Sequence, residues 1–199
     1  MSAAFSRDAL LDAFDQIGRA AVLAGTKLQI AVYGGSALML ASNFRFATVD
    51  VSELEHPLPD WLAAVVHEIA KKNLWQDDWF NDGVAFHLSP LADRAADHLE
   101  FGTFPRDGTS PGLAVSVPSA EYLLALKLKA VRVLDPVRGE TERLDILNLM
   151  QVVGISTAEE AIALLGRYFP VSAASSEKQR FLLENMSREG GIDAPKYPR

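Results

Sequence analysis

The sequence predicts an α+β fold, in which a mixed β-sheet carries flanking helices and a helical C-terminal half follows. Two patterns lead to this class. Short apolar, β-prone runs alternate with amphipathic helical segments as far as residue 118. From Ser119 onward only helical patterns follow one another. We therefore expect two parts in the 199-residue chain, an α/β core over residues 1–118 and a helical region over residues 119–199.

The composition is typical of a globular protein of the cytoplasm. Hydrophobic residues make up 49% of the chain, which is enough for a substantial core. The net charge of −7 argues against an overall basic surface for nucleic acid, although a local basic patch stays compatible with it. The absence of cysteine excludes disulfides and zinc–thiolate sites. No run approaches the roughly 20 apolar residues of a membrane helix, and the N-terminal segment lacks the pattern of a signal peptide.

The first helix is expected from Arg7 to Leu23. Ser6 can cap it, because a serine hydroxyl accepts a hydrogen bond from an amide of the first helical turn. Gly25 supplies a stop signal just beyond its end. The apolar residues of this segment recur at helical spacing: Leu10, Phe14, Ile17 and Ala21.

The stretch on which the functional interpretation depends begins with a β-prone run, Leu28 to Tyr33, that stops at Gly34-Gly35. Ser36 is placed to cap a short apolar helix, Ala37 to Ala41. Glycines let backbone amides come close to an anion, and a helix N-terminus adds a partial positive charge beside them. The segment is therefore a candidate phosphate site. The structural alternative is a tight strand-to-helix turn with no ligand.

A second β-prone run, Phe46 to Val51, places Asp50 close to its end and follows Arg45. An acid at the end of a neighbouring strand can hold a divalent metal ion that bridges the same phosphate. The alternative is that Asp50 faces solvent. The sequence thus proposes the order strand, glycine turn, short helix, strand and acid.

The middle of the chain is expected to form a helix from about Asp60 to Lys72, followed by a polar and aromatic loop over residues 75–83. The large aromatics and acids of this loop either form a rim for a nucleotide or plug the edge of the core. Three β-prone runs separated by turn residues come next, at residues 84–88, 99–104 and 113–117.

The C-terminal region reads as a series of helices. A capping box, Thr157-x-x-Glu160, opens one helix that continues to Tyr168, and Pro170 is expected to end it. The remaining helices are expected at about residues 120–134, 140–153 and 176–188.

Three separated motifs resemble parts of one known family, the minimal nucleotidyltransferases related to DNA polymerase β. They are Gly34-Gly35-Ser36-Ala37-Leu38 with Arg45-x-Ala47-Thr48-x-Asp50, then Trp79-Phe80-Asn81-Asp82, and then Leu124-Ala125-Leu126-Lys127 with Asp135 and Asp145. The nearest branch is that of the AbiEii-like toxins of type IV toxin–antitoxin systems. The resemblance covers residues 28–170.

The resemblance implies a nucleotidyltransferase-like sheet and an enzyme that moves a nucleotide from an NTP to RNA or protein, with Mg²⁺ or Mn²⁺ as cofactor and a cognate antitoxin as partner. Members of the family continue Asp-x-Asp where this chain has Asp50 and Ser52. A hydroxyl binds Mg²⁺ as a neutral ligand and cannot replace the missing charge. The acidic motif is therefore degenerate, and a catalytically inactive nucleotide-binding or protein-interaction module of the same fold is the alternative function.

The candidate site residues follow from these motifs. The predicted nucleotide-binding residues are Gly34, Gly35, Ser36, Arg45 and Lys127; the predicted metal ligands are Asp50 and Ser52; and Asp50 and Glu100 are the predicted catalytic acids. Asp97 and Asp82 are alternatives to Glu100, and Glu55 is an alternative to Ser52. Lys127 lies on an apolar helix face, where a buried ammonium needs an anion. A phosphate or Asp145 would serve, unless the lysine reaches solvent from the helix edge.

Overall fold

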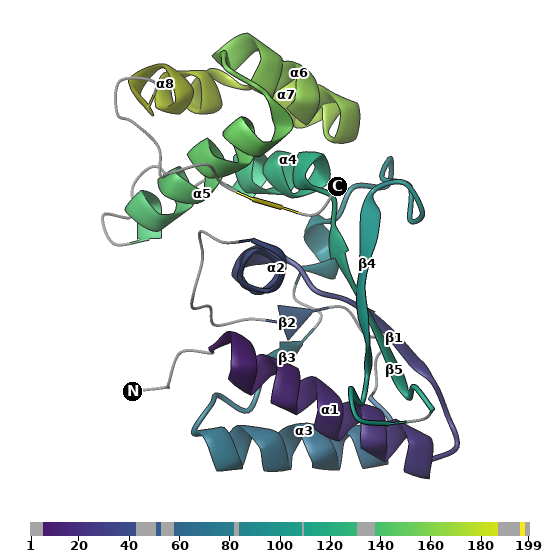
Figure 1. Ribbon diagram of the computed structural model, residues 1–199. Helices are drawn as coiled ribbons and strands as arrows, with labels where there is room; N and C mark the ends of the chain where they lie inside the picture. Colours follow the sequence, from purple (N-terminus) through teal and green to yellow (C-terminus); the bar gives the residue numbers. More distant parts are fainter. Residues whose placement is uncertain are drawn as a thin grey trace. The chain divides into compact units, whose positions relative to one another are not determined.

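The protein is described by a computed structural model (Figure 1), which describes residues 6–42, 51–52, 58–81, 84–108, 110–130, 138–186 and 196–197. The chain forms two compact units. The core unit comprises Met1–Ala41, Arg45–Phe86 and His98–Val117, and the helical unit comprises Ser42–Phe44, His87–Asp97 and Pro118–Arg199. Residues 87–97 thus belong to the helical unit, although they lie in the first half of the chain.

The core unit combines helices with short strands, so the predicted α+β class is confirmed. Its elements are α1 (Arg7–Leu23), β1 (Leu28–Ala31), α2 (Gly34–Ala41), β2 (Val51–Ser52), α3 (Asp60–Asn73), β3 (Phe80–Asn81), the 3₁₀ turn η1 (Ala85–His87), β4 (His98–Phe104) and β5 (Leu113–Pro118). A three-stranded mixed sheet has the order β1-β5-β4, and β2 and β3 form a separate parallel pair.

Strands β1 and β5 run parallel, with Leu28 opposite Leu113 and Ala31 opposite Ser116. The amide of Val32 continues the ladder with a hydrogen bond of 2.9 Å to the carbonyl oxygen of Ser116. The C-terminal end of β1 is buried, so both burial and the ladder hold the residues that precede the following turn.

Helix α1 has the bounds and the cap that the sequence predicts. The Ser6 hydroxyl accepts a hydrogen bond from the amide of Ala9 at 3.2 Å, and Gly25 follows the helix with φ +67°. The expected apolar face is buried, and the Phe14 ring packs edge-on against Phe104 of β4 at 5.3 Å between centroids. Figure 1 shows α1 and α3 side by side in the core unit, where they pack together.

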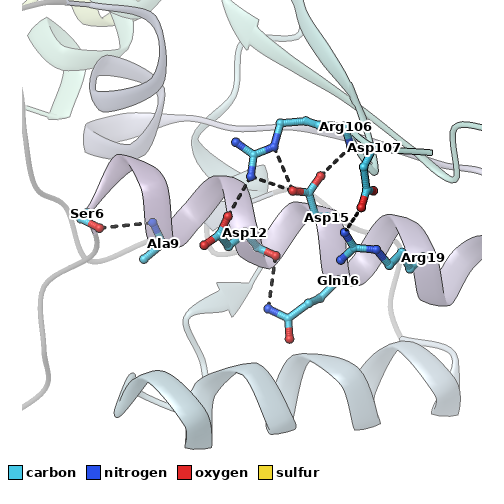
Figure 2. A network of polar contacts seen from close by, with 8 residues as sticks. All are labelled: Ser6, Ala9, Asp12, Asp15, Gln16, Arg19, Arg106 and Asp107. Carbon is cyan, nitrogen blue, oxygen red and sulfur yellow. Dashed lines mark hydrogen bonds and ion pairs between the residues drawn. The ribbon is translucent and has the colours of Figure 1, made fainter.

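The turn after β4 is held against α1 by the polar network in Figure 2. The carboxylate of Asp15 is buried and accepts three hydrogen bonds of 2.7–2.8 Å from the amide and guanidinium of Arg106. Arg106 also donates to Asp12 at 2.7 Å, and Arg19 donates to Asp107 at 2.8 Å. The hydrogen bonds to Asp15 raise the pKa of Arg106. Each oxygen of the buried carboxylate has a donor. These charge-assisted hydrogen bonds offset the free-energy cost of burying the charge and hold the turn in place.

The helical unit contains five helices within the described residues. They are α4 (Ala120–Ala130), α5 (Arg138–Val153), α6 (Ala158–Tyr168), α7 (Pro170–Ala174) and α8 (Glu177–Met186). Both halves of the predicted capping box at Thr157 and Glu160 are present. Helix α6 ends at Tyr168 as expected, but Pro170 begins α7, because its fixed φ suits a first helical position.

Residues 87–97 are attached to this unit by polar contacts. The amide of Ser89 donates to the Tyr122 hydroxyl at 2.9 Å, and the Ser89 hydroxyl donates to the carbonyl oxygen of Tyr168 at 2.6 Å. The Tyr168 hydroxyl donates to Asp97 at 2.6 Å, and burial together with this acceptor raises the pKa of Tyr168. This segment is therefore a structural part of the helical unit.

One expectation about the middle of the chain needs correction, and one alternative that the sequence left open is decided. The run at residues 84–88 is not a strand but contains the 3₁₀ turn Ala85–His87, and Phe86 stays 88% exposed. β-propensity favours a strand only where a partner buries one face, and this run gains no such burial. In the predicted loop over residues 75–83, Trp79 is 1% exposed and its indole N–H donates to the carbonyl oxygen of Val66 at 3.1 Å. Of the two alternatives for the aromatics of this loop, the structure shows for Trp79 the one in which it plugs the core.

Candidate functional site

The turn between β1 and α2 combines a buried strand, a glycine in a left-handed conformation and a helix N-terminus. Gly34 is the first residue of α2 and has φ +62°. A Cβ atom placed on Gly34 would meet nothing within 4 Å. The requirement for glycine at this position is therefore conformational, since an L-residue with a side chain adopts this φ at a cost of about 1–2 kcal/mol.

Helix α2 starts earlier than the sequence predicts, and this corrects the role of Ser36. The first helical hydrogen bond runs from the amide of Ala37 to the carbonyl oxygen of Tyr33 at 3.3 Å. Ser36 is thus the third residue of α2 and 0% exposed, so it does not cap a helix beginning at Ala37. The glycine pair instead forms the first two residues of the helix, and the positive φ of Gly34 changes the direction of the chain there.

The solvent-accessible part of the turn consists of the two glycines. Gly34 and Gly35 are half-buried, whereas Ser36 is fully buried. The first amides of any α-helix point beyond its N-terminus and carry the positive end of the helix dipole. A ligand at this turn would therefore meet the backbone of Gly34 and Gly35 and not the Ser36 side chain, and the helix dipole favours an anion there.

Tyr33 connects this turn to the far strand of the sheet. Its hydroxyl lies 2.7 Å from Nε2 of His98, and the two rings meet edge-on with 5.7 Å between centroids. Tyr33 follows β1 and His98 begins β4, so the contact spans β5, which lies between these strands. His98 is not among the site residues that the sequence predicts. No local signal marks a pair that is 65 residues apart.

The predicted acids are only partly covered by the structure. Glu100 lies on β4, is exposed, and falls two residues after His98, which places both on one face of a regular strand. Ser52 ends β2, and its backbone is in register with Asn81 of β3. Asp50 and Arg45 lie outside the described residues. Within the described ranges, no three histidine or acidic residues come together as a set of metal ligands.

Lys127 lies in the helical unit, on α4, and has a carboxylate partner there. Its ammonium is 2.7 Å from a carboxylate oxygen of Asp145 on α5. The Lys127 and Asp145 side chains are 14% and 3% exposed, so this is a buried ion pair and the lysine does not extend into solvent. The sequence left a phosphate and Asp145 open as the partner of Lys127, and the structure shows the contact with Asp145. A contact of Lys127 with phosphate stays a prediction.

No single helix in the described part of the chain has the length and apolar character needed to span a membrane. No family model, curated protein or solved structure matches the chain.

Proposed function

We propose that this chain is a nucleotidyltransferase-like protein of the cytoplasm that binds an NTP at the β1–α2 turn. The observation that carries the proposal is the conformation of Gly34, which has φ +62° and starts a helix two residues after Val32 has made the last ladder hydrogen bond of β1. Such a turn aims backbone amides at one point, and that is how glycine turns bind phosphate groups. The resemblance of the surrounding motifs to nucleotidyltransferases supports the same ligand class.

The proposed activity is transfer of a nucleotide from the NTP to RNA or protein, as in a toxin of a toxin–antitoxin pair, with Mg²⁺ or Mn²⁺ at the acids. Metal ions neutralise a triphosphate and polarise the bond to the leaving group. Asp50 is the predicted principal ligand, Ser52 a neutral one, and Glu100 the third acid. The described residues contain no complete ligand set, so the metal site depends on Asp50.

The substitution of serine for the second acid of the family motif favours a second candidate, an inactive module that keeps the nucleotide pocket. The Ser52→Asp variant distinguishes a weakened enzyme from an inactive module. For a weakened enzyme, this change should tighten Mn²⁺ binding and raise turnover, because it restores one negative charge. Asp50→Ala should then abolish both. A module would show NTP binding, with no turnover in either variant.

The proposal is tested by titration calorimetry with each of the four NTPs in the presence of Mg²⁺. Wild-type protein should bind at least one of them, and Gly34→Ala should weaken the binding. Gly25→Ala is a matched control in the same unit, because Gly25 also has a positive φ (+67°) and open space around its Cβ position. Both variants carry the same backbone strain, so equal melting temperatures with unequal affinities assign the effect to the turn. No heat with any NTP would contradict the proposal.

A further inference from the structure

Tyr33 is held from three directions at the start of the candidate site. The preceding residue, Val32, is hydrogen-bonded through its amide to β5. The Tyr33 carbonyl oxygen accepts the first helical hydrogen bond of α2, from Ala37. The Tyr33 hydroxyl reaches His98 on β4 at 2.7 Å. The residue before Gly34 therefore joins the sheet, the helix and the far strand.

Of these three contacts, the one between Tyr33 and His98 is made by side chains. The other two use backbone atoms and follow from the strand and the helix themselves. The hydroxyl–imidazole contact instead joins the Tyr33 ring to the first residue of β4, on the far side of β5, and Tyr33 is the residue directly before Gly34. A glycine with open space around it has no side chain to hold its own conformation. Its φ is then set by its neighbours.

We infer that His98 is a positioning residue, which acts through the Tyr33 hydroxyl to hold the Gly34–Gly35 turn in the conformation that binds the nucleotide phosphates. This inference rests on the proposed function. His98 itself needs no contact with the ligand. Its role is to reduce the number of conformations that the turn samples before binding, and fewer such conformations give a higher affinity.

The two substitutions that remove the contact are Tyr33→Phe and His98→Phe. Each should weaken affinity for the NTP that wild-type protein binds most tightly with Mg²⁺, by about three- to tenfold, the range of one net hydrogen bond. The double variant should lose no more than either single one, because both remove the same contact. His98→Gln should restore most of the affinity, since its amide group reaches the position of Nε2.

The control is Tyr122→Phe, which removes the hydroxyl of another buried tyrosine, hydrogen-bonded to the amide of Ser89 in the helical unit. It should lower the melting temperature by a similar amount and leave the NTP affinity unchanged. A loss of affinity in Tyr122→Phe as large as that in Tyr33→Phe would mean that general destabilisation is responsible, and would overturn the inference.

Amide hydrogen exchange of the unliganded protein separates this inference from the proposed function. The reporter is the amide of Ala37, whose acceptor is the Tyr33 carbonyl. If His98 holds the turn, exchange at Ala37 should accelerate by about three- to tenfold in Tyr33→Phe and His98→Phe, and return toward the wild-type rate in His98→Gln. Unchanged exchange would overturn the inference while NTP binding by wild-type protein still stands. Accelerated exchange in a protein that binds no NTP would instead refute the proposed function, and the nucleotide role of His98 with it.

Discussion

The N-termini of α6 and α2 differ in what the chain provides to satisfy their first amides. At α6, the Thr157 hydroxyl accepts from the amide of Glu160, and the Glu160 carboxylate accepts from the amides of Ser156 and Thr157. At α2, the first two residues are Gly34 and Gly35, which bring no side chain to the helix end. The side chains of Thr157 and Glu160 thus cap α6, whereas the first two residues of α2 contribute only backbone atoms to its N-terminus, where the helix dipole favours an anion.

The same contrast applies to the charged groups. Lys127 and Asp145 of the helical unit satisfy each other in a buried pair at 2.7 Å, so nothing beyond the unit is needed to explain them. The β1–α2 turn of the core unit is built from backbone instead. The comparison teaches that the two sets of predicted site residues differ in kind: Lys127 has a structural partner in Asp145, whereas Gly34 is required by its backbone conformation, and a ligand at its turn stays a prediction.

Breaking the Lys127–Asp145 pair should give the largest effect. Asp145→Ala leaves the ammonium of a side chain that is only 14% exposed without its partner, and should lower the free energy of unfolding of the protein by about 3–5 kcal/mol. Urea denaturation measures this loss. Replacing both partners, with Lys127→Met and Asp145→Leu, should recover most of it. A loss below about 1 kcal/mol in Asp145→Ala would show that the pair behaves as a surface pair.

A carboxylate side chain at the N-terminus of α2 should occupy its first amides, as the capping box does at α6. Gly35 does not share the positive φ of Gly34, so it accepts a side chain without that strain. Gly35→Asp places a carboxylate at the positive end of the helix dipole, where it competes with phosphate, and should weaken NTP binding by at least about tenfold without loss of stability. Gly35→Ala is the uncharged control. Equal affinities of the two variants would argue against an anion site at this turn.

Removing the N-terminal cap of α6 should affect the stability of the protein and leave NTP binding unchanged. Thr157→Ala removes the hydroxyl that accepts from the amide of Glu160, and should lower the free energy of unfolding by about 1 kcal/mol. Thermal unfolding checks this value, with Ser175→Ala as a control, because the Ser175 hydroxyl donates to a backbone carbonyl at an exposed position. A change in NTP affinity in Thr157→Ala would show that α6 is not the purely structural N-terminus described above.

The smallest expected effect is a dependence of stability on pH at the same helix end. Hydrogen bonds from the amides of Ser156 and Thr157 lower the pKa of Glu160 below its usual 4.5. The carboxylate therefore stabilises the folded protein above the unfolded pKa, and this contribution is lost as the pH falls through the lowered folded pKa. Glu160→Gln should remove this part of the acid dependence, measured as the difference in melting temperature between pH 7 and pH 3. An unchanged difference would contradict the capping role.

The parts of the fold that the sequence predicted correctly are those with local causes. The Ser6 cap, the bounds of α1 and the Thr157–Glu160 capping box depend on residues within one or two helical turns, and each is observed. The β5 strand, expected at residues 113–117 and observed at Leu113–Pro118, has clear period-2 burial. The helix caps are readable because the interacting groups are close in the sequence, and β5 is readable because buried and half-buried residues alternate along it.

The features that the sequence missed depend on tertiary contacts. Ser36 fits a helix cap by type, but the helix starts at Gly34, three residues before the expected Ala37, and Ser36 is buried. The run at residues 84–88 is β-prone, yet no partner buries Phe86. The hydrogen bonds between Arg106 and Asp15 join residues 91 positions apart. For the candidate site, the glycine turn is readable from the sequence, whereas the Tyr33–His98 contact follows only from the strand order β1-β5-β4.

The most direct test of the account is a titration of ¹⁵N-labelled protein with NTP and Mg²⁺, followed through the glycine amide resonances. The account predicts that the amide signals of Gly34 and Gly35 shift in a saturable way. Gly25 and Gly154 are internal controls, because both also have a positive φ and open surroundings, and their signals should stay in place. Saturable binding that shifts other residues and leaves Gly34 and Gly35 unmoved, or the absence of any saturable shift, would contradict the central claim that the β1–α2 turn is a phosphate site.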